Sequence, residues 1–217
     1  MPKELVLSSE GKAVLREYAD RPAGEGEVKI KTLFGAPKHG TELTTYQYDP
    51  HAESYYDEEA HIFKKRTVRE SAYGKAGLGN MFVGEIIEAG PGVSTCTVGE
   101  RVAGYGSLKP THVKKETDIL KMAERMSWQE AVCFDPLQFA VGGLRDGHVR
   151  IGDRVLVSGL GAIGMMAAQG AKRAGASLVA VSDPIEKRRR AALASGADIA
   201  YDPSTEDIGL LLRDRTG

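Results

Sequence analysis

A glycine-rich segment in the second half of the chain restricts the fold more than any other feature. The residues from Gly159 to Gly164 have the form G-x-G-x-x-G, follow the apolar run 155–157 and precede an apolar pattern with helical spacing. Gly159 permits a tight turn, Gly161 leaves room for a phosphate to approach the backbone, and Gly164 allows close packing of helix on strand. The segment therefore predicts a strand, a phosphate-binding turn and a helix whose N-terminus faces the phosphates.

An acidic residue, Asp183, follows the glycine run by about 20 residues, directly after a second apolar run at 178–181. A carboxylate there accepts hydrogen bonds from both ribose hydroxyls of an adenosine and repels a 2′-phosphate, so NAD is favoured over NADP. The basic run 187–190 leaves an alternative open, because its side chains hold a 2′-phosphate or form the solvated face of a helix. The residues predicted to bind the cofactor are Gly159, Leu160, Gly161, Ala162, Ile163, Gly164, Asp183 and Arg188.

Composition excludes several classes of protein. With 41% hydrophobic residues among 217, the chain has enough apolar surface for a core and is neither disordered nor collagen-like. A net charge of −1 gives no electrostatic case for binding nucleic acid or an anionic membrane. Two cysteines cannot form a disulfide framework, and no secretory or transmembrane segment is apparent. We expect a cytoplasmic protein that acts on a small molecule.

The first half of the chain is predicted to be a small barrel-like β domain. Residues 28–34 alternate between apolar and polar, 81–89 form a second extended run that ends in a Gly-Pro-Gly turn, and 98–105 suggest a further strand with its turn. Residues 49–69 break this pattern, because acidic residues are followed by basic ones. They are interpreted as a solvated loop or short helix, or alternatively as a lid over a substrate cleft.

Strands and helices alternate in the second half. Ser127 and Glu130 have the spacing of a capping box and predict a helix start, and Pro136 is expected to kink or end that helix. The apolar runs 155–157 and 178–181 are typical of a parallel sheet covered on both faces. A weak third strand is expected at 199–201, and apolar residues between 208 and 212 suggest one more helix.

A β domain followed by this nucleotide fold resembles the medium-chain dehydrogenase/reductase superfamily, the relatives of zinc alcohol dehydrogenase. The segments that carry the resemblance are Glu27–Lys31, Phe82–Gly90, Val98–Val102, Asp135–Leu137 and Gly152–Val157. It implies an α/β chain with a GroES-like β-barrel domain at 1–122, holding the substrate and catalytic residues, and the N-terminal half of an NAD(P)-binding Rossmann domain, a doubly wound parallel sheet, at 123–217.

The zinc-binding motifs of that family are altered here. The family's C-G-T-D motif is replaced by His39-Gly40-Thr41-Glu42, and its G-H-E motif is replaced by Gly79-Asn80-Met81. Asn and Met are poor ligands for zinc, and two cysteines are too few for a structural four-cysteine site. No metal is therefore expected, and the pattern most resembles the zinc-lacking, bacteriochlorophyllide-type dehydrogenase-like subgroup.

Without zinc, another donor must stabilise the substrate oxygen. Thr41 matches the family's proton-relay residue, and His39 and Lys38 are neighbouring donors, so these three are the candidate catalytic residues. The resemblance implies a zinc-independent, alcohol dehydrogenase-like oxidoreductase that transfers hydride to or from a carbonyl, an alcohol or an activated alkene.

The resemblance also implies a longer protein. The family continues for roughly a hundred residues beyond the region matched here, so the chain is expected to be completed by a missing C-terminal segment or to act as a homo-oligomer. The alternative function is a non-catalytic nucleotide-binding or assembly module that has lost the chemistry.

Overall fold

The computed structural model describes residues 1–217 except 9–11, 39, 41, 43–53, 66–76 and 217. Two compact units, Met1–Val132 and Cys133–Gly217, divide the chain. The boundary expected at 122/123 differs from this division by the segment 123–132, which carries α2 (Trp128–Val132), and α2 lies against β6 of the first unit.

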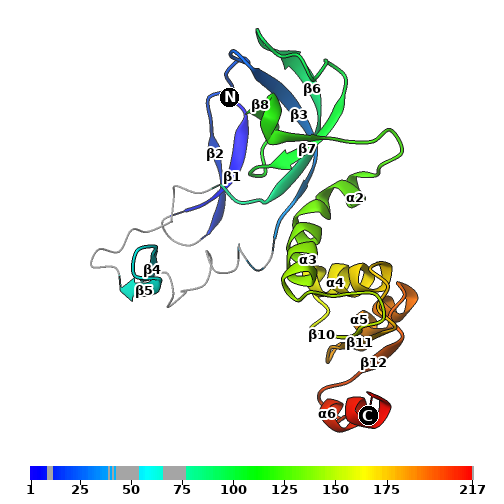
Figure 1. Ribbon diagram of the computed structural model, residues 1–217. Helices are drawn as coiled ribbons and strands as arrows, with labels where there is room; N and C mark the ends of the chain where they lie inside the picture. The colour runs from blue at the N-terminus through cyan, green and yellow to red at the C-terminus, as the bar shows by residue number, and fades with distance from the viewer. Residues whose placement is uncertain (9–11, 39, 41, 43–53, 66–76, 217) are drawn as a thin grey trace. The chain divides into compact units, whose positions relative to one another are not determined.

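The first unit is built around a curved antiparallel sheet in the strand order β8-β3-β6-β7-β9 (Figure 1). A two-stranded sheet, β1–β2, and a hairpin, β4–β5, accompany it. The strands of this unit are β1 (Lys3–Leu7), β2 (Ala13–Glu17), β3 (Glu27–Ala36), β4 (Ser54–Asp57), β5 (Ile62–Lys65), β6 (Met81–Ala89), β7 (Arg101–Tyr105), β8 (Thr111–Lys115) and β9 (Ile119–Lys121).

Apolar side chains on one face of β3 and β6 form the core of this unit. Val28 and Ile30 on β3 pack with Phe82 and Ile86 on β6, and all four are fully buried. The side chain of Trp128 on α2 stacks on Phe34, with ring centroids 4.6 Å apart. The predicted β domain is thus confirmed as a GroES-like half-barrel.

Within the described part of 49–69, residues 54–65 form the hairpin β4–β5 rather than a loop or a short helix. Its register pairs Tyr56 with Phe63, and an ion pair joins Lys64 to Asp57 at 2.6 Å. The side chain of Phe63 is 72% exposed. None of the described side chains of this hairpin is buried, so its sequence has no alternating apolar pattern that would indicate a strand.

The second unit contains a parallel sheet in the order β10-β11-β12, as predicted. Helices α4 and α5 lie on the face where Val155, Val157, Val179 and Val181 form the core. The elements of this unit are α3 (Phe134–Asp146), β10 (Arg154–Ser158), α4 (Ala162–Arg173), β11 (Leu178–Ser182), α5 (Glu186–Ala194), β12 (Ile199–Tyr201) and α6 (Ile208–Thr216).

The helix that begins after Ser127 ends at Val132, four residues before Pro136, where a proline removes the i to i−4 hydrogen bond. The helical segment breaks at Cys133, and Pro136 lies in the first turn of α3. A proline is tolerated there because the first backbone N–H groups of a helix have no intrahelical acceptor.

Candidate functional site

The glycine run forms the turn between β10 and α4. Gly159 has a φ of +85°, a conformation that side chains with a Cβ rarely adopt. A Cβ on Gly164 would lie 1.9 Å from the carbonyl oxygen of Gly159, so only glycine lets the helix approach the strand this closely. Both glycines are therefore needed for the turn itself, whether or not a ligand binds.

Gly161 differs from these two, because it is the N-cap of α4 and a Cβ there would meet no atom within 4 Å. No side chain caps this helix N-terminus. The orphan N–H groups of the first turn and the positive end of the helix dipole thus border open space, an arrangement that fits a phosphate. Leu160, between the glycines, points into the core and is 2% exposed.

Asp183 lies directly beyond β11 and is 3% exposed. Its Oδ2 accepts a hydrogen bond from the backbone N–H of Leu160 at 2.8 Å, and its Oδ1 accepts one from Ile185 at 2.8 Å. Burial alone would raise the pKa of this carboxyl, but the two backbone donors and the Arg188 guanidinium together hold the pKa below its usual value. Asp183 is thus ionised near neutral pH and directly linked to the glycine run.

Arg188 approaches the same carboxylate, with 3.4 Å between its Nη1 and Oδ2 of Asp183. Its side chain is 47% exposed. The structure therefore brings together the glycine run, Asp183 and Arg188. A carboxylate offers about four acceptor positions, and three donors among the described residues bond to this one, so capacity remains for a ribose hydroxyl.

Sequence reasoning missed two further residues beside Asp183. Arg189 donates to the backbone carbonyl oxygen of Asp183 at 2.6 Å and pairs with Asp202 at 3.0 Å. The basic run was a visible signal, but the pairing of Arg189 with Asp202 depends on how β11 and β12 align.

Among the candidate catalytic residues, Lys38 is described, whereas His39 and Thr41 lie outside the described residues. The backbone N–H of Lys38 donates to the carboxylate of Glu42 at 2.7 Å, and its carbonyl accepts from the backbone N–H of Glu42 at 3.0 Å. These contacts join Lys38 to Glu42, the described residues on either side of His39 and Thr41.

The residues in place of the zinc-binding G-H-E motif are held by the β domain. Met81 opens β6 and is 1% exposed in the interior, and the backbone of Asn80 bonds with Ala36 and Gly106. Among the described residues, no group of three or more His, Cys, Asp or Glu side chains is arranged to hold a metal ion. His39 lies outside that set.

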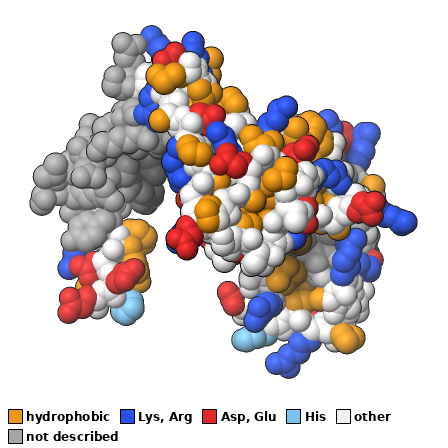
Figure 2. Space-filling view, turned by 90° about the horizontal axis from the view of Figure 1, so that it is seen from above, with side chains coloured by type: hydrophobic (Ala, Val, Ile, Leu, Met, Phe, Trp, Pro, Cys, Tyr) orange, Lys and Arg blue, Asp and Glu red, His pale blue; other side chains and the backbone are white. Residues whose placement is uncertain are grey.

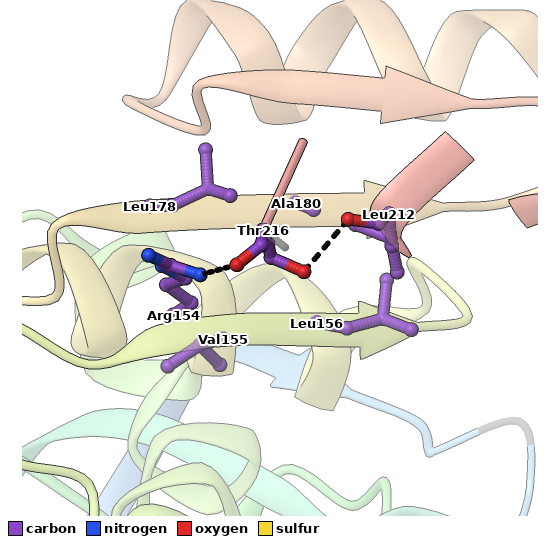
Figure 3. Close-up of a pocket in the computed structure, with 7 residues that line it drawn as sticks. All are labelled: Arg154, Val155, Leu156, Leu178, Ala180, Leu212 and Thr216. Atoms are coloured by element: carbon purple, nitrogen blue, oxygen red, sulfur yellow. Dashed lines mark hydrogen bonds between the residues drawn. The ribbon is translucent and has the colours of Figure 1, made fainter. Parts of the chain in front are cut away.

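A cavity of about 300 Å³ lies on the face of the parallel sheet opposite α4 (Figure 3). Leu156, Leu178 and Ala180 line its sheet side, and Leu212 and Thr216 of α6 close it. Arg154 donates to the carbonyl oxygen of Thr216, and the hydroxyl of Thr216 donates to Leu212 at 2.8 Å. This cavity contains neither the glycine run nor Asp183, so it is separate from the candidate nucleotide site.

Lys/Arg and Asp/Glu side chains are interspersed over the displayed face in Figure 2 rather than separated by sign. This pattern agrees with the net charge of −1. No described helix is long and apolar enough to cross a membrane.

In the second unit, a strand, a glycine turn, a helix and an acidic residue after the next strand have the order found in dinucleotide-binding folds. No family model matches this chain. The chain is 44% identical over 222 residues to D-guloside 3-dehydrogenase of Escherichia coli K12, an alignment that covers 99% of this chain and 63% of that relative. It is 26% identical over 167 residues to (R,R)-butanediol dehydrogenase of Bacillus subtilis, covering 64% of this chain and 48% of the relative.

A solved structure has the same fold. The crystal structure of 2R,3R-butanediol dehydrogenase from Bacillus subtilis matches with a TM-score of 0.78 at 22% identity, over 100% of this chain and 68% of the other. The fold therefore matches that of medium-chain dehydrogenase/reductase structures, with a GroES-like half-barrel followed by the start of a parallel sheet with helices. The chain spans less than two thirds of the length of both sequence relatives.

Proposed function

We propose that the chain provides the β domain and the adenosine-binding part of an NAD(P)-dependent dehydrogenase that acts on a hydroxyl group of a sugar derivative. The observation that carries the nucleotide part is the open helix N-terminus at Gly161 beside the buried, ionised Asp183. The substrate class is supported by the 44% identity to D-guloside 3-dehydrogenase along nearly the whole chain. A short chain alcohol dehydrogenase from E. coli CFT073, solved with NADH, has the same fold, with a TM-score of 0.75 at 23% identity over 99% of this chain and 66% of that one.

Different residues of the chain would bind the pyrophosphate and the ribose of the nucleotide. The first turn of α4 binds the pyrophosphate, and Asp183 accepts hydrogen bonds from the ribose hydroxyls, with NAD preferred to NADP because its charge repels a 2′-phosphate. A ribose hydroxyl replaces the half-exposed Arg188 guanidinium beside the Asp183 carboxylate, since the nitrogen of Arg188 lies 3.4 Å from that oxygen. The bound nicotinamide supplies a hydride acceptor or donor, which protein side chains cannot provide.

Thr41 is the proposed proton relay, with His39 and Lys38 as neighbouring donors, and no zinc takes part. A hydroxyl both donates and accepts, so it can hold the proton of the reacting substrate oxygen while hydride is transferred. His39 then passes that proton to solvent, because the reference pKa of histidine lies near neutrality.

The nucleotide proposal is tested by replacing Gly161 with valine. The open space above Gly161 is where a phosphate must approach, so a branched side chain there should weaken NADH binding at least about tenfold. NADH fluorescence titration of the 217-residue chain measures this. Gly142→Val is the matched control, because a Cβ there also meets nothing within 4 Å and Gly142 lies on α3. Unchanged NADH affinity in Gly161→Val would refute the assignment.

The catalytic part is tested on the chain alone and on a chimera in which Gly217 is followed by the remainder of the E. coli relative. Methyl glycosides of gulose and of other hexoses are offered with NAD⁺, and NADH formation is followed. Glycoside-dependent NADH formation supports the dehydrogenase. A chimera that binds NADH but oxidises none of these glycosides or simple alcohols would instead support the non-catalytic module.

A further inference from the structure

The three arginines at 188–190 have different partners in the structure. Arg188 reaches the carboxylate of Asp183, Arg189 pairs with Asp202, and Arg190 pairs with Glu186 one helical turn away. The arginine side chains are 47%, 17% and 74% exposed, respectively. Arg189 is therefore the most buried of the three arginines.

One nitrogen of Arg189 makes two contacts. Its Nη1 donates to the backbone carbonyl oxygen of Asp183 at 2.6 Å and lies 3.0 Å from Oδ2 of Asp202. Asp202 is held in turn, since its Oδ1 accepts from the backbone N–H of Ser204 at 3.0 Å. The Ser204 N–H and the Arg189 guanidinium keep the pKa of Asp202 below its usual range. Arg189 is thus fixed between β12 and the residue that follows β11.

Both backbone polar groups of Asp183 are tied to the end of β12. Its N–H donates to the carbonyl oxygen of Tyr201 at 3.3 Å, and its own carbonyl is linked through Arg189 to Asp202. The carboxylate is anchored separately to the backbone of Leu160 and Ile185. The direction in which the Asp183 carboxylate points therefore depends on the Arg189–Asp202 pair as well as on the glycine run.

We propose that Arg189 and Asp202 are positioning residues for the ribose diol. They hold the Asp183 backbone so that its carboxylate receives both ribose hydroxyls, and they make no contact with the nucleotide themselves. This inference rests on the proposed nucleotide-binding function. It also means that Arg189 is not available as a ligand for a 2′-phosphate, because its charge is already paired with Asp202.

The test compares ADP with 2′,3′-dideoxy-ADP, which lacks the diol, by isothermal titration calorimetry on the 217-residue chain. The wild-type chain should prefer ADP by at least about tenfold, because the two hydroxyls bond to a charged acceptor. Arg189→Leu should lose most of this preference by weakening ADP binding about tenfold, while dideoxy-ADP binding stays unchanged. A merely structural role would weaken both nucleotides equally and would overturn the proposal.

Three further variants separate the alternatives. Arg189→Lys should recover most of the preference, because a single ammonium replaces the single nitrogen that makes both contacts. Asp202→Asn should behave like Arg189→Leu. Arg190→Leu is the matched control, because Arg190 is exposed and contacts Glu186 instead, and it should bind like the wild type. If Arg189→Leu keeps the full preference for ADP, only the positioning role fails; if the wild-type chain binds neither nucleotide, the proposed function fails with it.

Discussion

Asp183 illustrates how much of a binding residue's behaviour is determined by the atoms around it. Burial disfavours its charge, and two backbone N–H groups with a guanidinium restore it. The sequence could predict Asp183, because a residue directly after the second strand of this fold lies beside the glycine turn. It could not predict Arg189 and Asp202, because their meeting depends on the alignment of Ser182 with Tyr201 across β11 and β12.

Thr41 is the residue on which zinc-free chemistry should depend. Changing Thr41 to valine keeps the shape and removes the hydroxyl, so turnover of the chimera should fall by roughly 100-fold or more. NADH affinity should change little, because the proposed adenosine site belongs to the other unit. Stopped-flow measurement of hydride transfer tests this.

Metal removal is the control for that prediction. After dialysis against a chelator, hydride transfer should proceed at the original rate. Loss of activity that returns with added zinc, or an unchanged rate in Thr41→Val, would contradict the proposed mechanism.

Because His112 is buried, we expect the stability of the β unit to depend on pH. His112 is 2% exposed, stacks on Phe82 with ring centroids 3.9 Å apart, and its Nε2 has no hydrogen-bond partner among the described residues. Burial, with the charges of Lys109 and Lys114, lowers its pKa from 6.5 to about 3. The unfolded chain therefore takes up a proton below pH 6.5 that the folded chain excludes, and stability falls from there towards pH 3.

Because of His112, the free energy of unfolding should fall by about 3 kcal/mol between pH 6.5 and about pH 4. His112→Gln cannot gain this proton, so its free energy of unfolding should depend less on pH between 6.5 and about 4, whatever its absolute value. Urea unfolding at several pH values measures the slope. The exposed His148, changed to Gln, is the control and should keep the wild-type slope. Equal slopes for wild type and His112→Gln would show that His112 is not responsible.

At the scale of elements, the helix start at 127 behaves as its sequence predicts. The hydroxyl of Ser127 accepts from the backbone N–H of Glu130 at 3.2 Å, and the backbone N–H of Ser127 donates to the Glu130 carboxylate at 2.7 Å. Ser127→Ala should therefore destabilise the first unit by about 1 kcal/mol, whereas Ser127→Asp should retain most of the cap. Thermal unfolding compares them; an alanine variant as stable as the wild type would show that the cap contributes nothing.

Strands with an apolar pattern in the sequence were predictable, and strands without one, such as β2 and β4–β5, were not. Residues 28–34 alternate because one side of the strand enters the core, and 81–89 are an extended run because most of the first half of that strand is buried. All five residues of β2 are exposed and no described side chain of β4–β5 is buried, so neither sequence shows the alternation that indicates a strand. The parallel strands have apolar runs, yet Leu156 is 45% exposed, because on its face of the sheet the described cover is α6.

At the scale of the whole molecule, the two units have separate cores. One cluster of buried side chains surrounds Phe82 and the other surrounds Val179 and Val181. The proposed adenosine site lies within the second unit, whereas the candidate catalytic residues lie within the first. Nucleotide affinity and proton transfer can therefore be altered by separate sets of substitutions.

The stack of Trp128 on Phe34 has an optical consequence. Trp128 is the single tryptophan of the sequence and belongs to the first unit. Its emission therefore records the unfolding of Met1–Val132, and Cys133–Gly217 has no tryptophan signal of its own. A melting curve followed by tryptophan emission reports the unfolding of the first unit alone. Comparison with far-ultraviolet circular dichroism, which detects the helices of both units, would reveal whether the two units unfold together.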